Sequence, residues 1–193
     1  MSNQSARLFI AIPLPSATTQ ALATIQSTLD NQLPPKTIRW QNTDKAHLTL
    51  FFLGPLSPDQ IATIKTALTP IPTQHQPFTL TTTTLGGFPH LKKPNVLWLG
   101  LAPTPPLQNL YNQITTTLAP LGLTPDHPTY NPHITLGRRN RQASRQKIKT
   151  IAPAIDNMTL PPIPPIPVNQ FHLYRSHQAQ YDILATYTLN ATP

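Results

Sequence analysis

Apolar and polar residues follow two patterns along the chain, one typical of β-strands and one typical of α-helices. Helical spacing predicts three helices, each closed by proline, from Ser16 to Pro34, from Ser57 to Pro70 and from Leu107 to Pro120. Strand composition marks residues 7–14, 38–40, 47–54, 78–85, 96–100, 133–137, 168–174 and 181–189. Loops are expected at residues 86–95, 138–149 and the proline-rich 161–167. This mixture predicts an α+β fold.

The order of these elements repeats. Each half of the chain reads as a strand, a helix and then a strand that opens with His-apolar-Thr-Leu, at His47 and again at His133. We interpret this as an internal duplication. It predicts one domain over residues 1–193, built from two pseudo-symmetric lobes whose antiparallel sheets and outer helices surround a central cleft.

The two histidine motifs carry the candidate chemistry. Side chains of a strand alternate between its faces, so His47 and Thr49 should share one face, and so should His133 and Thr135. If the lobes are related by a pseudo-twofold axis, the two His-Thr pairs meet across the cleft. Leu48 and Ile134, which directly follow the two histidines, then pack on the opposite face of their strands.

Two imidazoles on opposite sides of a phosphate suit the hydrolysis of a cyclic phosphodiester. One must accept a proton from water and the other must donate one to the departing ribose oxygen, and both tasks suit a pKa near neutrality. The threonine hydroxyls can donate hydrogen bonds to the non-bridging oxygens as negative charge builds there. A single histidine of this kind is more often structural, but two copies at equivalent places favour catalysis.

Two further function classes fit part of the pattern. An RNA-binding or nucleotide-binding module could keep the cleft without turnover, although binding alone would not demand two titratable groups at equivalent places. A metallohydrolase could use His47 and His133 as ligands, but only Asp44 and Asp126 are acidic residues near the motifs, and catalytic zinc usually takes three protein ligands. The chain has no G-x-x-x-x-G-K phosphate loop, so an ATP-driven ligase is not expected.

Composition narrows the choice of partners. The chain has no cysteine, which excludes disulfides, thiolate nucleophiles and cysteine-based metal sites. Its 14 Lys and Arg against 6 Asp and Glu give a net charge of +8, which favours an anionic partner such as nucleic acid and equally fits a charge that only aids solubility. The polar residues 1–6 and the absence of a long apolar run predict no signal peptide, no membrane span and a cytoplasmic protein.

Several segments resemble a known family. They are Arg7-Leu-Phe-Ile-Ala-Ile, His47-Leu-Thr-Leu-Phe-Phe-Leu-Gly, Val96-Leu-Trp-Leu-Gly, Pro132-His-Ile-Thr-Leu-Gly-Arg and Phe171-His-Leu-Tyr-Arg-Ser. On these residues the chain is similar to the two-histidine (2H) phosphoesterases, and among them to the LigT-like RNA 2′,3′-cyclic phosphodiesterases. The resemblance implies a bilobal α+β fold and hydrolysis of RNA 2′,3′-cyclic phosphates to 2′-phosphomonoesters, with no metal or other cofactor.

The resemblance also implies the roles of the motif residues. His47 would be the proton donor and His133 the proton acceptor, an order that spacing alone does not give, and Thr49 and Thr135 would complete the catalytic set. The implied partners are RNA ends that carry a 2′,3′-cyclic phosphate, including tRNA halves, which such enzymes join through a 2′-5′ linkage when an RNA hydroxyl replaces water. A cleft formed by one chain predicts a monomer.

Four further residues are implied as substrate-binding residues. Arg138 matches a family arginine near the nucleotide, where a guanidinium can bind phosphate or stack on a base, although an exposed arginine at a strand end fits as well. Tyr130 takes the place of a family aromatic residue, in a segment that lacks the arginine often found there. Tyr174 and Ser176 match a Tyr-x-Ser strand that could line the cleft, while a tyrosine on such a strand often belongs to the core.

Overall fold

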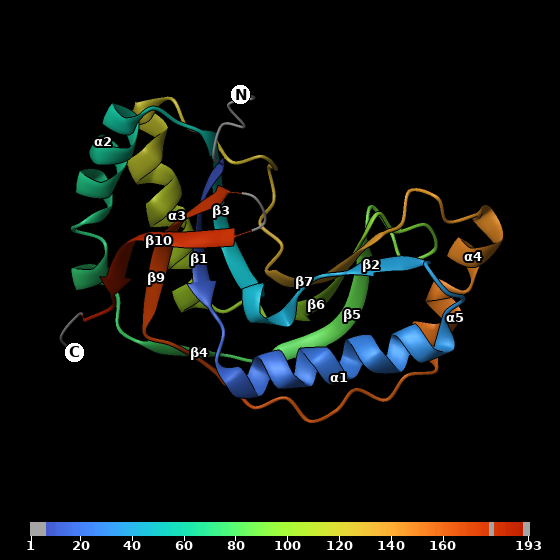
Figure 1. Cartoon of the computed structure of the whole chain (residues 1–193). Helices are drawn as coiled ribbons and strands as arrows, with labels where there is room; N and C mark the ends of the chain where they lie inside the picture. The colour runs from blue at the N-terminus through green and yellow to red at the C-terminus, as the bar shows by residue number, and fades with distance from the viewer. Residues whose placement is uncertain (1–6, 178–179, 191–193) are drawn as a thin grey trace.

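The computed structural model describes residues 7–177 and 180–190 (Figure 1). The strands are β1 (Arg7–Pro13), β2 (Ile38–Trp40), β3 (His47–Pro55), β4 (Phe78–Leu80), β5 (Thr82–Phe88), β6 (Val96–Leu101), β7 (His133–Arg139), β8 (Ile166–Val168), β9 (Gln170–His177) and β10 (Gln180–Thr188). The α-helices are α1 (Ser16–Gln32), α2 (Pro58–Leu68), α3 (Pro105–Leu118), α4 (Arg145–Lys149) and α5 (Ile151–Asp156). Short 3₁₀ helices are η1 (Thr43–Lys45), η2 (Pro72–Gln74) and η3 (Ala119–Leu121).

The strands form one large antiparallel sheet and one small one. The large sheet has the order β10-β9-β1-β3-β7-β6-β5, with β2 also paired to β7, and β4 pairs with β8 in the second sheet. We call β10, β9, β1 and β3 the first half, and β7, β6, β5 and β2 the second half. Between them, β3 and β7 share only the residue pair Leu48 and Ile134 in register. The predicted bilobal α+β fold is confirmed, whereas the extent of the domain, 1–193, stays a prediction.

The helices that connect the strands cross over to the opposite half. In both halves a strand, a helix and an adjacent antiparallel strand follow one another, as β1-α1-β3 and as β6-α3-β7. Yet α1 packs under the second half, where Gln26 Nε2 donates hydrogen bonds to the carbonyls of Gln41 and Leu136 at 2.8 and 2.9 Å. In turn, α3 packs with α2 beside β3 of the first half (Figure 1). This exchange ties the two halves together despite their narrow strand contact.

A β-bulge interrupts both histidine strands at the same place. Leu50 in β3 and Leu136 in β7, each three residues after its histidine, have no partner in the neighbouring strand's register. A bulge shifts the alternation of side chains by one residue. Phe52 and Arg138, which strict alternation would turn away, therefore share the face of the histidines.

The structure corrects several predicted boundaries. The strand expected at 78–85 is divided into β4 and β5, and β5 continues to Phe88 through part of the expected loop. Gly86 suggested a loop, but a side chain at this position would collide with the Trp98 indole, so the glycine leaves room for that ring on the neighbouring strand. The extended segment 161–167 ends in β8, which pairs with β4.

The basic segment 138–149 is also more ordered than predicted. Strand β7 continues to Arg139, and α4 begins after Ser144, whose hydroxyl accepts a hydrogen bond from the Lys147 backbone at 3.3 Å. The prediction of a loop was wrong because this helix has one buried apolar residue, Ile148, and so shows no apolar periodicity. Helix α5 was missed because it has six residues and contains Pro153, although Ile151 and Ala154 are buried.

Residues 1–6, which contributed to the expectation of no signal peptide, lie outside the described residues. Among the helices that the structure does describe, none has the length and apolar character needed to cross a membrane.

The contact between the halves makes a testable prediction about stability. Leu48 is fully buried at the junction, whereas Leu121 in η3 is 40% exposed. We expect Leu48→Ala to lower the free energy of unfolding by about 3 kcal/mol, because it leaves a cavity in the core. The matched substitution Leu121→Ala should change it by no more than about 0.5 kcal/mol. Urea denaturation measures both, and equal losses would contradict the structural importance of the junction.

Candidate active site

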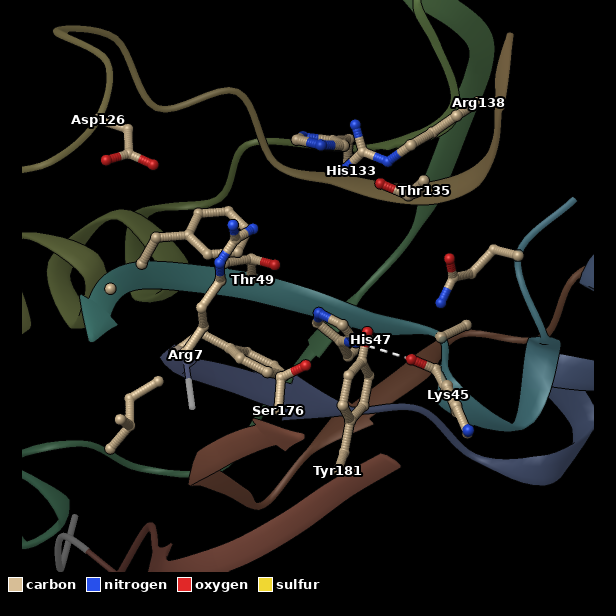
Figure 2. Close-up of a pocket in the computed structure, with 16 residues that line it drawn as sticks. Arg7, Lys45, His47, Thr49, Asp126, His133, Thr135, Arg138, Ser176 and Tyr181 are labelled. Carbon is tan, nitrogen blue, oxygen red and sulfur yellow. Dashed lines mark hydrogen bonds between the residues drawn. The ribbon is translucent and has the colours of Figure 1, made fainter. Parts of the chain in front are cut away.

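A cavity of about 500 Å³ lies where the two halves meet (Figure 2). It contains six of the eight predicted site residues: His47, Thr49, His133, Thr135, Arg138 and Ser176. Because β3 and β7 are antiparallel at Leu48 and Ile134, their register directs His47 toward Thr135 and Thr49 toward His133. The four motif residues therefore surround one space, as the alternation of the two strands predicted.

Each catalytic candidate histidine is held by the same backbone hydrogen bond. The Nδ1 atom of His47 lies 2.8 Å from the carbonyl oxygen of Lys45, and that of His133 lies 2.7 Å from the carbonyl oxygen of Asn131. A carbonyl only accepts, so Nδ1 carries the hydrogen in both rings. The neutral rings therefore keep the lone pair on Nε2, which is the atom left to exchange a proton with a ligand.

Aromatic side chains fix the orientation of the two imidazoles. Phe9 stacks on His47 with ring centroids 4.8 Å apart, and Tyr181 contacts the same ring edge-on at 5.5 Å. On the other side of the cavity, Phe88 contacts His133 edge-on at 4.9 Å. These contacts and the backbone hydrogen bonds leave each ring little freedom to rotate, which is the preorganisation that proton transfer requires.

Burial and local charge lower the pKa of both histidines. For His47, desolvation lowers the pKa most, the Lys45 carbonyl raises it, and the positive charge of His133 lowers it. For His133, desolvation again has the largest effect, the Asn131 carbonyl opposes it, and the charges of Arg138 and His127 lower the pKa further. Both imidazoles therefore favour the neutral form more than a solvated histidine does.

The cavity is predominantly basic. Arg7 from β1, Lys45 from η1 and Arg138 from β7 line it, and Asp126 is the acidic residue in its lining (Figure 2). Arg138 lines it because of the bulge at Leu136. Cations from both halves around two histidines form a site suited to a phosphate group.

Two residues predicted to bind substrate lie outside the lining. Tyr130 stacks on Tyr111 at 4.0 Å and donates a hydrogen bond to the Thr49 carbonyl at 3.2 Å, and burial raises its pKa. Tyr174 stacks behind Phe9 at 5.1 Å. The structure thus gives both tyrosines a packing role behind the cavity wall, and their contact with substrate stays a prediction.

The lining also contains residues that the sequence did not single out. They are Arg7, Leu8, Phe9, Gln41, Lys45, Ala46, Phe52, Gly54, Asp126 and Tyr181. Phe9 lies on the same face as the motif because β1 pairs with β3 so that Ala11 lies opposite Thr49. This placement depends on the strand register, which the sequence alone does not contain. Tyr181 comes from β10, which is separated from β3 by β9 and β1, and had no local signal.

Over the part of the chain that the structure describes, no group of three or more His, Cys, Asp or Glu side chains is arranged as metal ligands.

The histidine geometry predicts what NMR should measure. Titration of the ring ¹⁵N and ¹³C resonances should give midpoints below about 6.5 for both His47 and His133, because burial disfavours their charged forms. Above its midpoint, each ring should show the tautomer protonated at Nδ1. A midpoint above 6.5, or the opposite tautomer, would contradict the arrangement described here.

Comparison with known proteins agrees with this site. The chain is 30% identical over 131 residues to an RNA 2′,3′-cyclic phosphodiesterase of Geobacillus stearothermophilus, covering 68% of this chain and 41% of that protein. It is 32% identical over 139 residues to the RNA 2′,3′-cyclic phosphodiesterase of Escherichia coli, covering 71% of this chain and 74% of that one. The crystal structure of E. coli LigT complexed with 3′-AMP superposes with a TM-score of 0.74 at 28% identity, over 95% of this chain and 98% of that one.

The model of one family covers both histidine motifs. It is described as the 2′-5′ RNA ligase superfamily, and it matches residues 39–180. Since that span is well over half of the chain and includes both bulged strands with their histidines, this protein belongs to the 2′-5′ RNA ligase superfamily.

Proposed function

We propose that this protein is an RNA 2′,3′-cyclic phosphodiesterase that forms 2′-phosphomonoesters, without a metal ion. The observation that carries the proposal is the matched pair of histidines, His47 and His133, each with Nδ1 bound to a backbone carbonyl and each lining the same basic cavity. The relatives named above are RNA 2′,3′-cyclic phosphodiesterases, and one structural neighbour was crystallised with a nucleotide.

The proposed reaction is a single displacement at phosphorus. The neutral Nε2 of one histidine takes a proton from water as its oxygen bonds to the phosphorus. The bond from phosphorus to the ribose O3′ breaks, and the Nε2–H of the other histidine donates its proton to O3′. The products are a 2′-phosphomonoester and a free 3′-hydroxyl, and the histidines exchange protonation states. Thr49, Thr135 and Arg138 would donate to the non-bridging oxygens, where negative charge grows.

We assign His133 as the proton acceptor and His47 as the proton donor, the order that the family resemblance implies. Burial lowers the pKa of both imidazoles most. The charges of Arg138 and His127 lower the pKa of His133 further, which suits a base that must be neutral.

The rest of the proposal follows from this chemistry. An RNA 5′-hydroxyl in place of water would give a 2′-5′ linkage by the same displacement, so ligation of RNA halves, such as those of tRNA, is included in the proposal. Since one chain supplies all of the described cavity, we propose that the protein acts as a monomer. We place this activity in the cytoplasm, where tRNA is found.

The proposal is tested with a short RNA that ends in a 2′,3′-cyclic phosphate, in buffer containing EDTA. The wild-type protein should form the 2′-phosphate. His47→Ala and His133→Ala should each lower kcat/KM by roughly 10²–10⁴, the usual contribution of one general acid or base. His75→Ala is the control, because His75 contacts Gln113 and does not line the cavity.

Other products would be equally informative. A 3′-phosphate product would agree with a two-histidine mechanism but would mean that O2′, and not O3′, is the leaving oxygen. Binding of the RNA without turnover would replace the enzyme with the binding module, and activity that EDTA abolishes would contradict metal independence.

The pH dependence follows from the lowered pKa values. One histidine must be protonated and the other neutral, so kcat/KM should follow a bell-shaped curve. Because both pKa values lie below the ordinary 6.5, its maximum should lie below about pH 6.5. In Arg138→Gln the loss of a nearby charge raises the pKa of His133, so the acidic limb should move to higher pH. An unmoved acidic limb would contradict the assignment of His133 as the base.

A further inference from the structure

The positive charge of the protein is concentrated on one half. Residues 36–45, 92–93 and 138–149 contain eleven of the fourteen basic residues, and they belong to the second half or to the segments beside it. That side carries three of the six acidic residues, Asp30, Asp44 and Asp156. The first half with α2, α3 and the loop after η3 carries the remaining three basic and three acidic residues. The net charge of +8 is therefore the charge of one side of the molecule.

The basic residues continue from the cavity across the sheet. Arg39 in β2 lies opposite Arg138 in β7 in the strand register, so their side chains share one face of the sheet. Arg138 lines the cavity, and β2 leads away from β3 toward α4 (Figure 1). Like charges on directly opposed residues are destabilising, so this pair costs stability unless an anion binds between them.

The next residue along this path is Lys36, in the turn between α1 and β2. Its backbone has φ of 60°, a left-handed conformation that favours glycine or asparagine, in a turn closed by the Thr37 amide and the Pro34 carbonyl at 3.2 Å. A lysine thus occupies a position whose backbone is strained, and its side chain is exposed. Helix α4 adjoins this turn, since Lys147 Nζ donates to the Pro35 carbonyl at 2.8 Å.

We call Arg39, Lys36, Arg145 and Lys149 the basic strip, which begins beside Arg138 of the cavity. The last two belong to α4 and are exposed. Among the described residues, Arg175 and Asp182 form an ion pair on the first half, at 2.9 Å. The charges of the strip are therefore not neutralised by that pair, and the strip is a surface for an extended polyanion.

We propose that the basic strip binds the phosphates that precede the RNA end held in the cavity. The proposal rests on the cyclic phosphodiesterase function above and extends it from a terminal nucleotide to an RNA of several nucleotides. The single-stranded RNA leaves the cavity past Arg138, follows β2 past Arg39 and Lys36, and reaches α4. Because the first half has no comparable basic surface, the distribution of charge directs the RNA over the second half.

The experiment compares two substrates, a 2′,3′-cyclic mononucleotide and a ten-nucleotide RNA that ends in the cyclic phosphate. For single strands, log K falls with log salt by about 0.7 per phosphate contact. In a plot of log kcat/KM against log salt concentration, the oligonucleotide should therefore give a steeper negative slope than the mononucleotide. The two slopes should differ by about 2 if the strip makes three phosphate contacts. Fluorescence anisotropy with the oligonucleotide ending in a 2′-phosphate measures binding without turnover.

A double variant, Lys36→Asn with Arg39→Gln, removes two charges, and asparagine suits the backbone of residue 36. It should lower the ratio of kcat/KM for the oligonucleotide to that for the mononucleotide about 25-fold at 0.1 M salt, and reduce the salt slope by about 1.4. The control, Asn109→Glu with Thr116→Glu on exposed positions of α3, changes the net charge equally on the other half. It should leave the ratio within about twofold.

The outcomes separate the inference from the function. If neither substrate is turned over, the proposed function fails, and anisotropy of the two variants still decides whether the strip binds RNA. If both substrates are turned over with equal salt slopes, or if the α3 control lowers the ratio as much as the strip variant, the strip is overturned while the function stands.

Discussion

The site depends on the burial of one residue pair between two strands. Leu48 and Ile134 are both fully buried where β3 meets β7. Because side chains alternate, this burial turns His47, Thr49, His133 and Thr135 to the opposite face. The apolar contact that joins the halves is thus also what faces the catalytic candidates toward each other, and the packing of the core and the geometry of the site cannot be separated.

The exchange of helices gives this junction its strength. A single pair of opposed strand residues would be a weak joint, but α1 lies against the second half and α3 against the first, each burying four residues along one stripe. Gln26 adds a specific anchor, since its amide spans the carbonyls of Gln41 and Leu136. Leu136 is the bulged residue that redirects Arg138, so the helix also supports the bulge.

The two sides of the cavity are similar in backbone and different in chemistry. At the position five residues after the histidine, a bulge presents the exposed Phe52 on one side and Arg138 on the other. Such a pair suits a ligand with a flat apolar part and an anionic part, as a nucleotide has. The unequal charge of the halves extends this difference beyond the cavity, so two halves with the same order of strand, helix and strand present different surfaces.

The sequence by itself determined the fold class, most strand positions and the four motif residues, because period-2 alternation and the repeated motif are local signals that need no partner strand. Alternation alone would turn Arg138 away from the cavity; the family resemblance pointed to this residue, and the bulge at Leu136, opposite β6, turns its side chain into the cavity. Phe9, Tyr181 and Arg7 likewise depend on which strands become neighbours. Helices α4 and α5 carry too few buried residues to be recognised. Tertiary structure decided these features because register, bulges and packing are set by contacts between residues far apart in the chain.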